Sequence, residues 1–154
     1  MYAAYDHLSD GLKNTLLKMR AEHFSRHSFG ATAYIDMDLD DVDDRLGNSA
    51  KATQDVTHPG IIKHPLSGKS ALYVNGDFTV KFEGWSKQES QPLLDYLYQH
   101  AYRNEFTCRF QWQKGAIEIW DNRTTHYCAL NDYQGERRLM HRITVEGEYL
   151  GLAL

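Results

Sequence analysis

The sequence predicts an α+β, mostly β fold: a partial double-stranded β-helix (jelly roll) with flanking helices. Two stretches have apolar residues at helical spacing, and several later stretches alternate apolar and polar residues as strands do. The helical stretches do not alternate with the strand-like ones, which argues against a doubly wound parallel sheet. Antiparallel strands with helices packed outside them fit this order better.

Two helices are expected. Ser9 can cap the first, and Leu12, Leu16, Met19 and His23 follow at helical spacing as a stripe that packs into the core.

The second helix opens with Ser86-Lys87-Gln88-Glu89, which has the pattern of a capping box. Pro92 fits poorly inside a helix, so a start near Gln91 with Pro92 in the first turn stays open. The buried face of this helix is expected to consist of Leu93, Leu94, Leu97 and Ala101.

From His58 onward the pattern becomes strand-like. A tight turn at Asn75-Gly76-Asp77 is expected between the first two expected strands, and a turn at Lys114-Gly115 between two later ones. The expected strands are residues 72–74, 78–82, 106–112, 116–120 and 138–145.

Composition indicates one soluble domain that covers residues 1–154, with 42% hydrophobic and 25% charged residues. The net charge is −4 and the basic residues are scattered, so a nucleic-acid partner is not expected. No apolar run is long enough to span a membrane, and the first residues lack the layout of an export signal. A cytoplasmic protein with two reduced cysteines is therefore predicted. The acidic stretch 36–44 is interpreted as a solvated segment rather than a calcium loop.

The last expected strand places Arg138 and Arg142 on one face, because side chains two and four residues apart share a face. Buried guanidinium groups need anionic partners, and their fork of donors suits a carboxylate or a sulfonate. Spacing alone favours an exposed face or structural salt bridges. The histidines His58, His64 and His141 are interpreted as structural, the first two in turns before prolines.

Several motifs in order resemble the TauD/TfdA-like taurine dioxygenase family of Fe(II)/2-oxoglutarate-dependent dioxygenases. They are Ala3-Ala4-Tyr5, His58-Pro59, His64-Pro65, Ser67-Gly68-Lys69, Leu72-Tyr73-Val74-Asn75, Phe78-Thr79, Glu105-Phe106, Trp120-Asp121-Asn122-Arg123, Asn131-Asp132-Tyr133 and Arg137-Arg138-Leu139-Met140-His141-Arg142.

The resemblance implies an oxidoreductase that uses iron(II) and 2-oxoglutarate to hydroxylate a small anionic, taurine- or sulfonate-like molecule. It implies that Arg138 binds the distal carboxylate of 2-oxoglutarate and that Arg142 binds the substrate anion. By the same resemblance, Ser28, Phe29 and Phe78 line the substrate pocket.

The chain departs from the family pattern at the metal ligands. It contains no His-x-Asp or His-x-Glu motif, which the family carries in its N-terminal half. The resemblance therefore implies the C-terminal part of a dioxygenase domain, without that half and inactive alone. Counted from Trp120, the remaining histidine ligand falls on Tyr127, and His126 stands one position early, so His126 as a metal ligand needs a local bulge.

Two functions stay open. One is a dioxygenase that needs the missing half or assembles as a homo-oligomer. The other is a non-catalytic remnant or assembly module that keeps a two-arginine anion site, since exposed strand edges must be covered.

Overall fold

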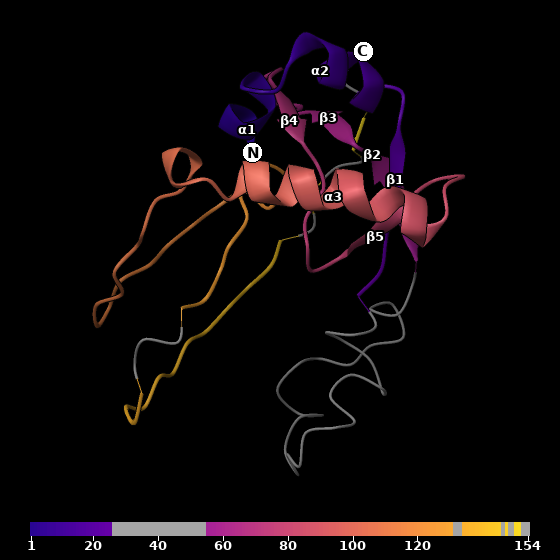
Figure 1. Ribbon diagram of the computed structural model, residues 1–154. Coiled ribbons are helices and arrows are strands. Elements are labelled where there is room, and N and C mark those ends of the chain that lie inside the picture. The colour runs from indigo at the N-terminus through magenta and orange to yellow at the C-terminus, as the bar shows by residue number, and fades with distance from the viewer. Residues whose placement is uncertain (26–54, 131–133, 146, 148–149, 152–154) are drawn as a thin grey trace.

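The computed structural model describes residues 1–25, 55–130, 134–145, 147 and 150–151. In this part of the chain, three α-helices and two small antiparallel sheets form a body from which two extended segments project (Figure 1). We call these segments, residues 107–130 and 134–145, the C-terminal arms. Neither closes a barrel with the sheets of the body, so a jelly roll is not formed by the described residues alone.

The larger sheet has three strands in the order β2 (Val56–Pro59), β1 (Arg20–His23) and β5 (Thr79–Phe82). All its pairs are antiparallel, and Ala21 lies opposite both His58 and Phe82. A register shift between Glu22 and His23 places His23 opposite Thr79. Such irregularities bend a strand and re-aim a side chain, here a buried histidine.

The smaller sheet pairs β3 (Ile61–Lys63) with β4 (Ser70–Leu72). The turn expected at residues 75–77 forms, because the Asn75 side chain accepts hydrogen bonds from the backbone N–H groups of Asp77 and Phe78. The strands on its two sides do not pair with each other, however: β4 pairs with β3, and β5 pairs with β1. The expected turn is therefore confirmed, and the two strands that it connects belong to different sheets.

The first expected helix is shorter than the stripe of residues, Leu12 to His23, that predicted it. Ser9 caps α2 (Asp10–Leu16) as predicted, accepting from the Leu12 N–H, and a further helix, α1 (Tyr2–Asp6), precedes it. The prediction that the helix reaches His23 is wrong, because Arg20–His23 forms β1. The backbone of β1 has partners on both sides, in β2 and β5, and this pairing outweighs the local helical spacing.

Helix α3 (Lys87–Ala101) begins as its capping box predicts, with Ser86 and Glu89 bonded reciprocally. The alternative start near Gln91 is wrong. Pro92 lies inside the helix on its exposed side, where water can satisfy the carbonyl that the proline cannot bond. Of the expected buried face, Leu94, Leu97 and Ala101 are buried and Leu93 is partly buried.

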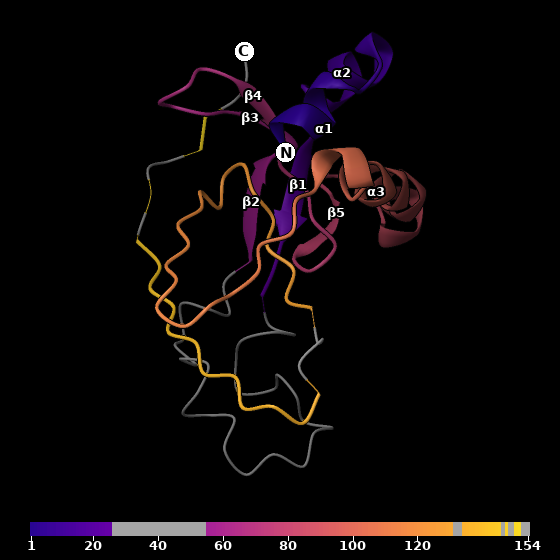
Figure 2. The ribbon, with the colours of Figure 1, turned by 90° about the vertical axis from the view of Figure 1, so that its left-hand side faces the viewer.

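The core lies between the sheets and the helices. Figure 2 shows α3 on one side of the larger sheet, with α1 and α2 at one end. The Ser90 hydroxyl joins α3 to β5: it accepts from the Phe82 N–H at 3.0 Å and donates to the Ser86 carbonyl at 2.9 Å. The buried apolar residues that form the core are Ala4, Leu8, Leu16, Ala21, Ile61, Leu72, Val74, Phe82, Leu94, Leu97 and Ala101.

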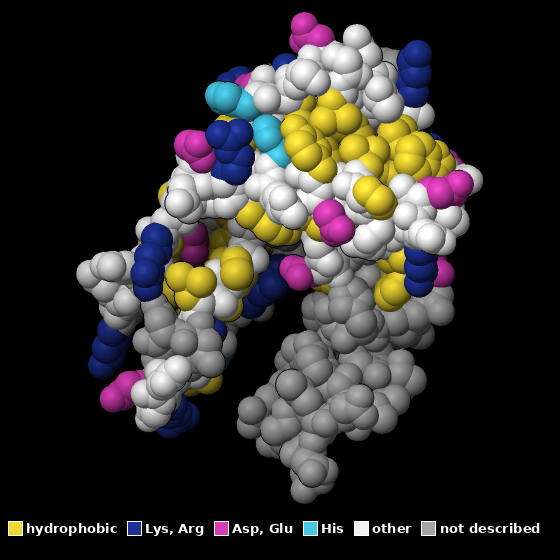
Figure 3. Space-filling model, viewed as in Figure 1, with side chains coloured by type: hydrophobic (Ala, Val, Ile, Leu, Met, Phe, Trp, Pro, Cys, Tyr) yellow, Lys and Arg dark blue, Asp and Glu magenta, His cyan; other side chains and the backbone are white. Residues whose placement is uncertain are grey.

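The strands expected at 106–112, 116–120 and 138–145 are not formed. Phe106 ends a 3-10 turn, and the described residues of the C-terminal arms contain no strand. The Lys114-Gly115 turn does form, with Gly115 at φ +82°. A strand needs backbone hydrogen bonds to a neighbouring strand, and within the described residues these segments take part in no strand pairing. Their apolar side chains are consequently exposed among basic ones (Figure 3), with Ile119 92% and Ile143 91% accessible.

Two simpler expectations concern the cysteines and membranes. Cys108 and Cys128 are free and exposed, in agreement with reduced thiols. Among the described residues, no helix has the length and apolarity that crossing a membrane requires.

Candidate anion site and neighbouring cavity

Four side chains of the C-terminal arms form a cluster, which we call the arginine–aromatic cluster: Trp120, Tyr127, Arg138 and Arg142. The rings of Trp120 and Tyr127 are stacked, with centroids 5.1 Å apart and an interplanar angle of 15°. Arg138 Nη2 donates a hydrogen bond to Tyr127 Oη at 3.0 Å. The guanidinium carbon of Arg142 lies 5.6 Å from the centroid of the Trp120 ring. Each arginine therefore has its own aromatic partner, and the two partners form one surface.

This arrangement suits anion binding. An arginine carries five N–H donors in a rigid fork that matches a carboxylate or a sulfonate, and it keeps its charge at all working pH values. A guanidinium over an indole ring is attracted by the π-face and keeps its edge available to a ligand. The cluster is exposed to solvent, so an anion can reach it without opening the core.

The base of the first arm is attached to the body by Asp121. Asp121 Oδ2 lies 2.8 Å from His64 Nε2, and the same carboxylate accepts bonds from the side chain and backbone N–H of Arg123. The hydrogen bonds from Arg123 hold the pKa of Asp121 far below its ordinary value, with a smaller contribution from His64. Asp121 thus stays ionised and holds the turn next to Trp120.

The side chains of His126 and Tyr127 contact different residues. Tyr127 lies in the arginine–aromatic cluster, whereas the His126 ring makes an edge-on contact with Tyr102, 6.2 Å between centroids. His126 Nδ1 is buried and has no hydrogen-bond partner. Burial, followed by the charge of the nearby Met1 amino group, lowers the pKa of His126 to about 4, although Asp77 acts in the opposite direction.

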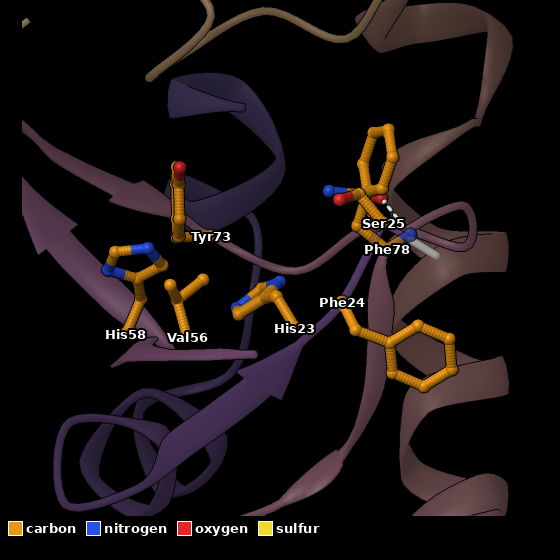
Figure 4. Close-up of a pocket in the computed structure, with 8 residues that line it drawn as sticks. His23, Phe24, Ser25, Val56, His58, Tyr73 and Phe78 are labelled. Atoms are coloured by element: carbon orange, nitrogen blue, oxygen red, sulfur yellow. Dashed lines mark hydrogen bonds between the residues drawn. The ribbon is translucent and has the colours of Figure 1, made fainter. Parts of the chain in front are cut away.

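A cavity of about 190 Å³ opens beside the larger sheet (Figure 4). His23 from β1 and His58 from β2 lie on one face of the sheet, and their ring centroids are 5.5 Å apart. Tyr73 lies 5.7 Å from His23 and 5.5 Å from His58, so the three rings surround one point. The eight residues that line the cavity are His23, Phe24, Ser25, Val56, His58, Tyr73, Asn75 and Phe78.

Both cavity histidines are neutral at neutral pH. Burial, and then the neighbouring His58, lowers the pKa of His23 to about 4. Burial and then Arg20 lower the pKa of His58. Burial also raises the pKa of Tyr73, which therefore keeps its proton. The cavity wall consequently carries no formal charge.

An iron centre of the facial-triad type needs two histidines and a carboxylate. Within the residues that the structure describes, no three His, Cys, Asp or Glu side chains gather so as to hold a metal ion. His126 lies beside Tyr102 rather than in the arginine–aromatic cluster. These residues do not fit a bound iron ion and support no reaction step through one.

The positions predicted from sequence fall into three groups. Arg138 and Arg142 lie together in the arginine–aromatic cluster, and Phe78 lines the cavity. Ser28 and Phe29, like the acidic stretch 36–44, lie outside the described residues.

Sequence reasoning missed the cavity. It assigned His23 to a helical stripe and His58 to a turn, but both lie in strands, so these two assignments are wrong. The alternation of Ala21 and His23 is too short to predict a strand by itself.

The chain matches a family model, that of the taurine catabolism dioxygenase TauD, TfdA family, over residues 1–144. This match covers most of the chain, and the protein therefore belongs to the TauD/TfdA family, a family of 2-oxoglutarate-dependent dioxygenases. It is 35% identical over 146 residues to an alkylsulfatase of Acinetobacter baylyi. It is 33% identical over 146 residues to an alpha-ketoglutarate-dependent sulfate ester dioxygenase of Pseudomonas putida.

Solved structures give the same assignment. A taurine dioxygenase from Burkholderia xenovorans superposes with a TM-score of 0.55 at 27% identity, covering 73% of this chain and 32% of that one. AAD-2, solved with Mn(II) and N-oxalylglycine, superposes with a TM-score of 0.54 at 28% identity, covering 73% of this chain and 41% of the other.

The chain spans just under half the length of its relatives. The two alignments cover 94% and 95% of this chain but 45% and 48% of the alkylsulfatase and the sulfate ester dioxygenase. The activity of a whole dioxygenase is therefore a separate question from membership of the family.

Proposed function

We propose that this chain is the C-terminal, anion-binding part of an Fe(II)/2-oxoglutarate-dependent dioxygenase domain that hydroxylates a small anionic molecule. The observation that carries the proposal is the arginine–aromatic cluster, in which two arginines of the family motif lie on one stacked pair of rings. Arg138 binds the distal carboxylate of 2-oxoglutarate, and Arg142 binds the anionic group of the substrate.

The relatives support an anionic substrate. One is a sulfate ester dioxygenase, and another, 31% identical, is a 2,4-dichlorophenoxyacetate dioxygenase of a Burkholderia strain. Sulfate, sulfonate and carboxylate groups all accept paired hydrogen bonds from a guanidinium fork. We therefore assign this chain a sulfonate-like, sulfate ester or carboxylate substrate, with taurine as the simplest sulfonate to test.

Iron would have to come to such a domain with ligands beyond those described. In the family, the iron ion supplies oxygen activation. The part that we assign to this chain is to bind and orient two anions. The C-terminal arms would then be strands of the jelly roll that pair once neighbouring strands are present, whether from an N-terminal half or from another copy of the chain.

A non-catalytic role is the second candidate. The observation that favours it is the lack, within the described part of the chain, of a three-ligand group for a metal. In this case the arginine–aromatic cluster binds anions without oxidising them, and the arms serve assembly.

Calorimetric titration of the whole chain with 2-oxoglutarate tests the anion site. Replacing Arg138 with Leu removes a charge-assisted pair worth about 2 kcal/mol, so binding should weaken about 30-fold. Arg137→Leu removes the same charge from the neighbouring position and should leave the affinity nearly unchanged. Equal 2-oxoglutarate affinities of Arg138→Leu and the parent would refute the assignment.

A second titration separates the two arginines. Arg142→Leu should weaken the binding of taurine or of a short alkyl sulfate while 2-oxoglutarate binding is kept. Turnover assays of the chain mixed with iron(II), with and without a family N-terminal half, then distinguish the catalytic from the non-catalytic role.

A further inference from the structure

The cavity beside β1 and β2 contains a buried polar atom without a partner. His23 is 6% exposed, and its Nε2 has no hydrogen-bond partner among the described residues. Leaving such an atom unsatisfied costs about 1–3 kcal/mol. Unlike a leucine or a phenylalanine, a histidine at this position offers a hydrogen-bonding atom to a group bound in the cavity.

The other nitrogen of His23 is already engaged. Nδ1 lies 3.1 Å from Thr79 Oγ1, which also accepts the N–H of Asn75 at 2.9 Å. This contact fixes the orientation of the His23 ring. His23 itself lies at the register shift of β1. If the Thr79 hydroxyl donates to Nδ1, Nε2 carries the proton and is a donor; if Nδ1 donates, Nε2 is an acceptor.

Among the described residues, the rest of the wall is mixed in polarity and carries no formal charge. Ser25, His58 and Asn75 are polar, Val56, Tyr73 and Phe78 are largely apolar, and none of the eight described lining residues is an acid, a lysine or an arginine. Figure 4 shows Val56 between His58 and His23, whereas the Phe24 ring points away from them toward α3. A volume of about 190 Å³ is somewhat larger than an apolar cavity of ~150 Å³ that accepts benzene.

We propose that this cavity binds an uncharged group of about the size of one six-membered ring, and that His23 selects a group with a hydrogen-bonding atom. Among the described residues that line the cavity there is no cation, so an anion has no charged partner in that lining. The inference rests on the proposed function in one respect: Phe78 belongs to the family's substrate pocket, so the ligand is the uncharged end of the same anionic substrate. His23 is then a specificity-determining residue of that substrate site.

Phenol and toluene are matched probes, because they differ by one hydroxyl group that can both donate and accept. Ligand-observed NMR titration of the whole chain should show phenol binding about tenfold more tightly than toluene. In His23→Leu this preference should disappear while toluene binding is kept. His7→Leu, which alters an exposed histidine outside the cavity, should bind both probes as the parent does.

A measurement on the unaltered protein covers the case in which His23→Leu does not fold. Phenol should shift the ¹⁵N resonance of His23 Nε2 and leave that of His7 unchanged. Anisole, which only accepts, should match phenol if Nε2 is a donor and match toluene if it is an acceptor.

The results of the phenol and toluene experiments can be distinguished from those of the 2-oxoglutarate titration that tests the proposed function. Equal binding of phenol and toluene, or no binding of either, overturns the cavity inference, and the second result leaves water alone as the partner of Nε2. Arg138→Leu should weaken 2-oxoglutarate binding about 30-fold, as above, and leave phenol binding unchanged. If the unaltered chain binds 2-oxoglutarate but shows no preference for phenol, the cavity inference alone is wrong; if it prefers phenol but does not bind 2-oxoglutarate, the anion-site proposal alone is wrong.

Discussion

His64 Nε2 lies 2.8 Å from Asp121 Oδ2, and this bond joins the segment after β3 to the base of the first C-terminal arm. His64 is buried, and its Nδ1 is held by the backbone N–H of Ser67 at 3.1 Å. The position of Trp120, one residue before Asp121, depends on this pair.

Asp121→Asn should therefore loosen the arm at its base. The amide keeps the shape of the side chain but loses the charge that binds Arg123 and His64. Because the Asp121 side chain is about one-third exposed, we expect a loss of only about 1 kcal/mol in the free energy of unfolding. Urea denaturation measures this loss, and hydrogen exchange should quicken at Thr124 and Thr125, whose N–H groups bond to the Asp121 carbonyl. Asp95→Asn, an exposed change on α3, serves as the control, and equal exchange rates in both variants would contradict the prediction.

Ser90→Ala should destabilise the body more than Ser86→Ala does. Ser90 is fully buried, and without its hydroxyl the N–H of Phe82 in β5 has no partner, which costs about 1–3 kcal/mol. Removing the exposed helix cap at Ser86 costs about 1 kcal/mol. Chemical denaturation of the two variants compares them directly. If Ser86→Ala were the more destabilising of the two, α3 would be held on β5 mainly by its leucines.

Acidification should weaken the fold through His23. Its pKa is lowered from 6.5 to about 4, so below pH 6.5 the unfolded chain takes up a proton that the folded chain refuses. The free energy of unfolding should fall between pH 6.5 and pH 4, by at most about 3 kcal/mol from this residue, and level off below. His126 contributes in the same direction. His23→Gln should flatten part of the slope and leave the His126 part; an unchanged slope would show that His23 does not titrate as inferred.

Iron(II) should bind weakly to this chain alone. Two or three protein ligands in a fixed geometry are needed for tight binding, and the described residues contain no such group. Anaerobic calorimetry of the metal-free protein with ferrous ion is the measurement. Stoichiometric binding at micromolar affinity would contradict the prediction and would point to ligands among the residues not described.

Local signals in the sequence were sufficient for part of the fold. The capping box of α3, the Ser9 cap and the glycine turn at Gly115 each depend on a few neighbouring residues, and each was predicted. The proximity of Arg138 and Arg142 was likewise expected, although it arises from contacts with Trp120 and Tyr127 and not from a strand.

The remaining features depend on distant partners. β1 forms because residues more than thirty positions away, in β2, and others in β5 pair with it, and a helical stripe ending at His23 contains no sign of this. The arms show the reverse case: their local pattern is that of strands, but no strand pairing forms there within the described residues. The cavity could not be predicted because it requires β1 and β2 to lie side by side.

The division between body and arms also bears on how the protein is made. Every residue of the hydrophobic core precedes Thr107, so burial of that core requires no side chain from either arm. Synthesis proceeds from the N-terminus, and domains can fold as they emerge. The body can therefore acquire its packing while the ribosome still holds the segment with both cluster arginines. In that order of events, the anion site would be completed after the core of the body.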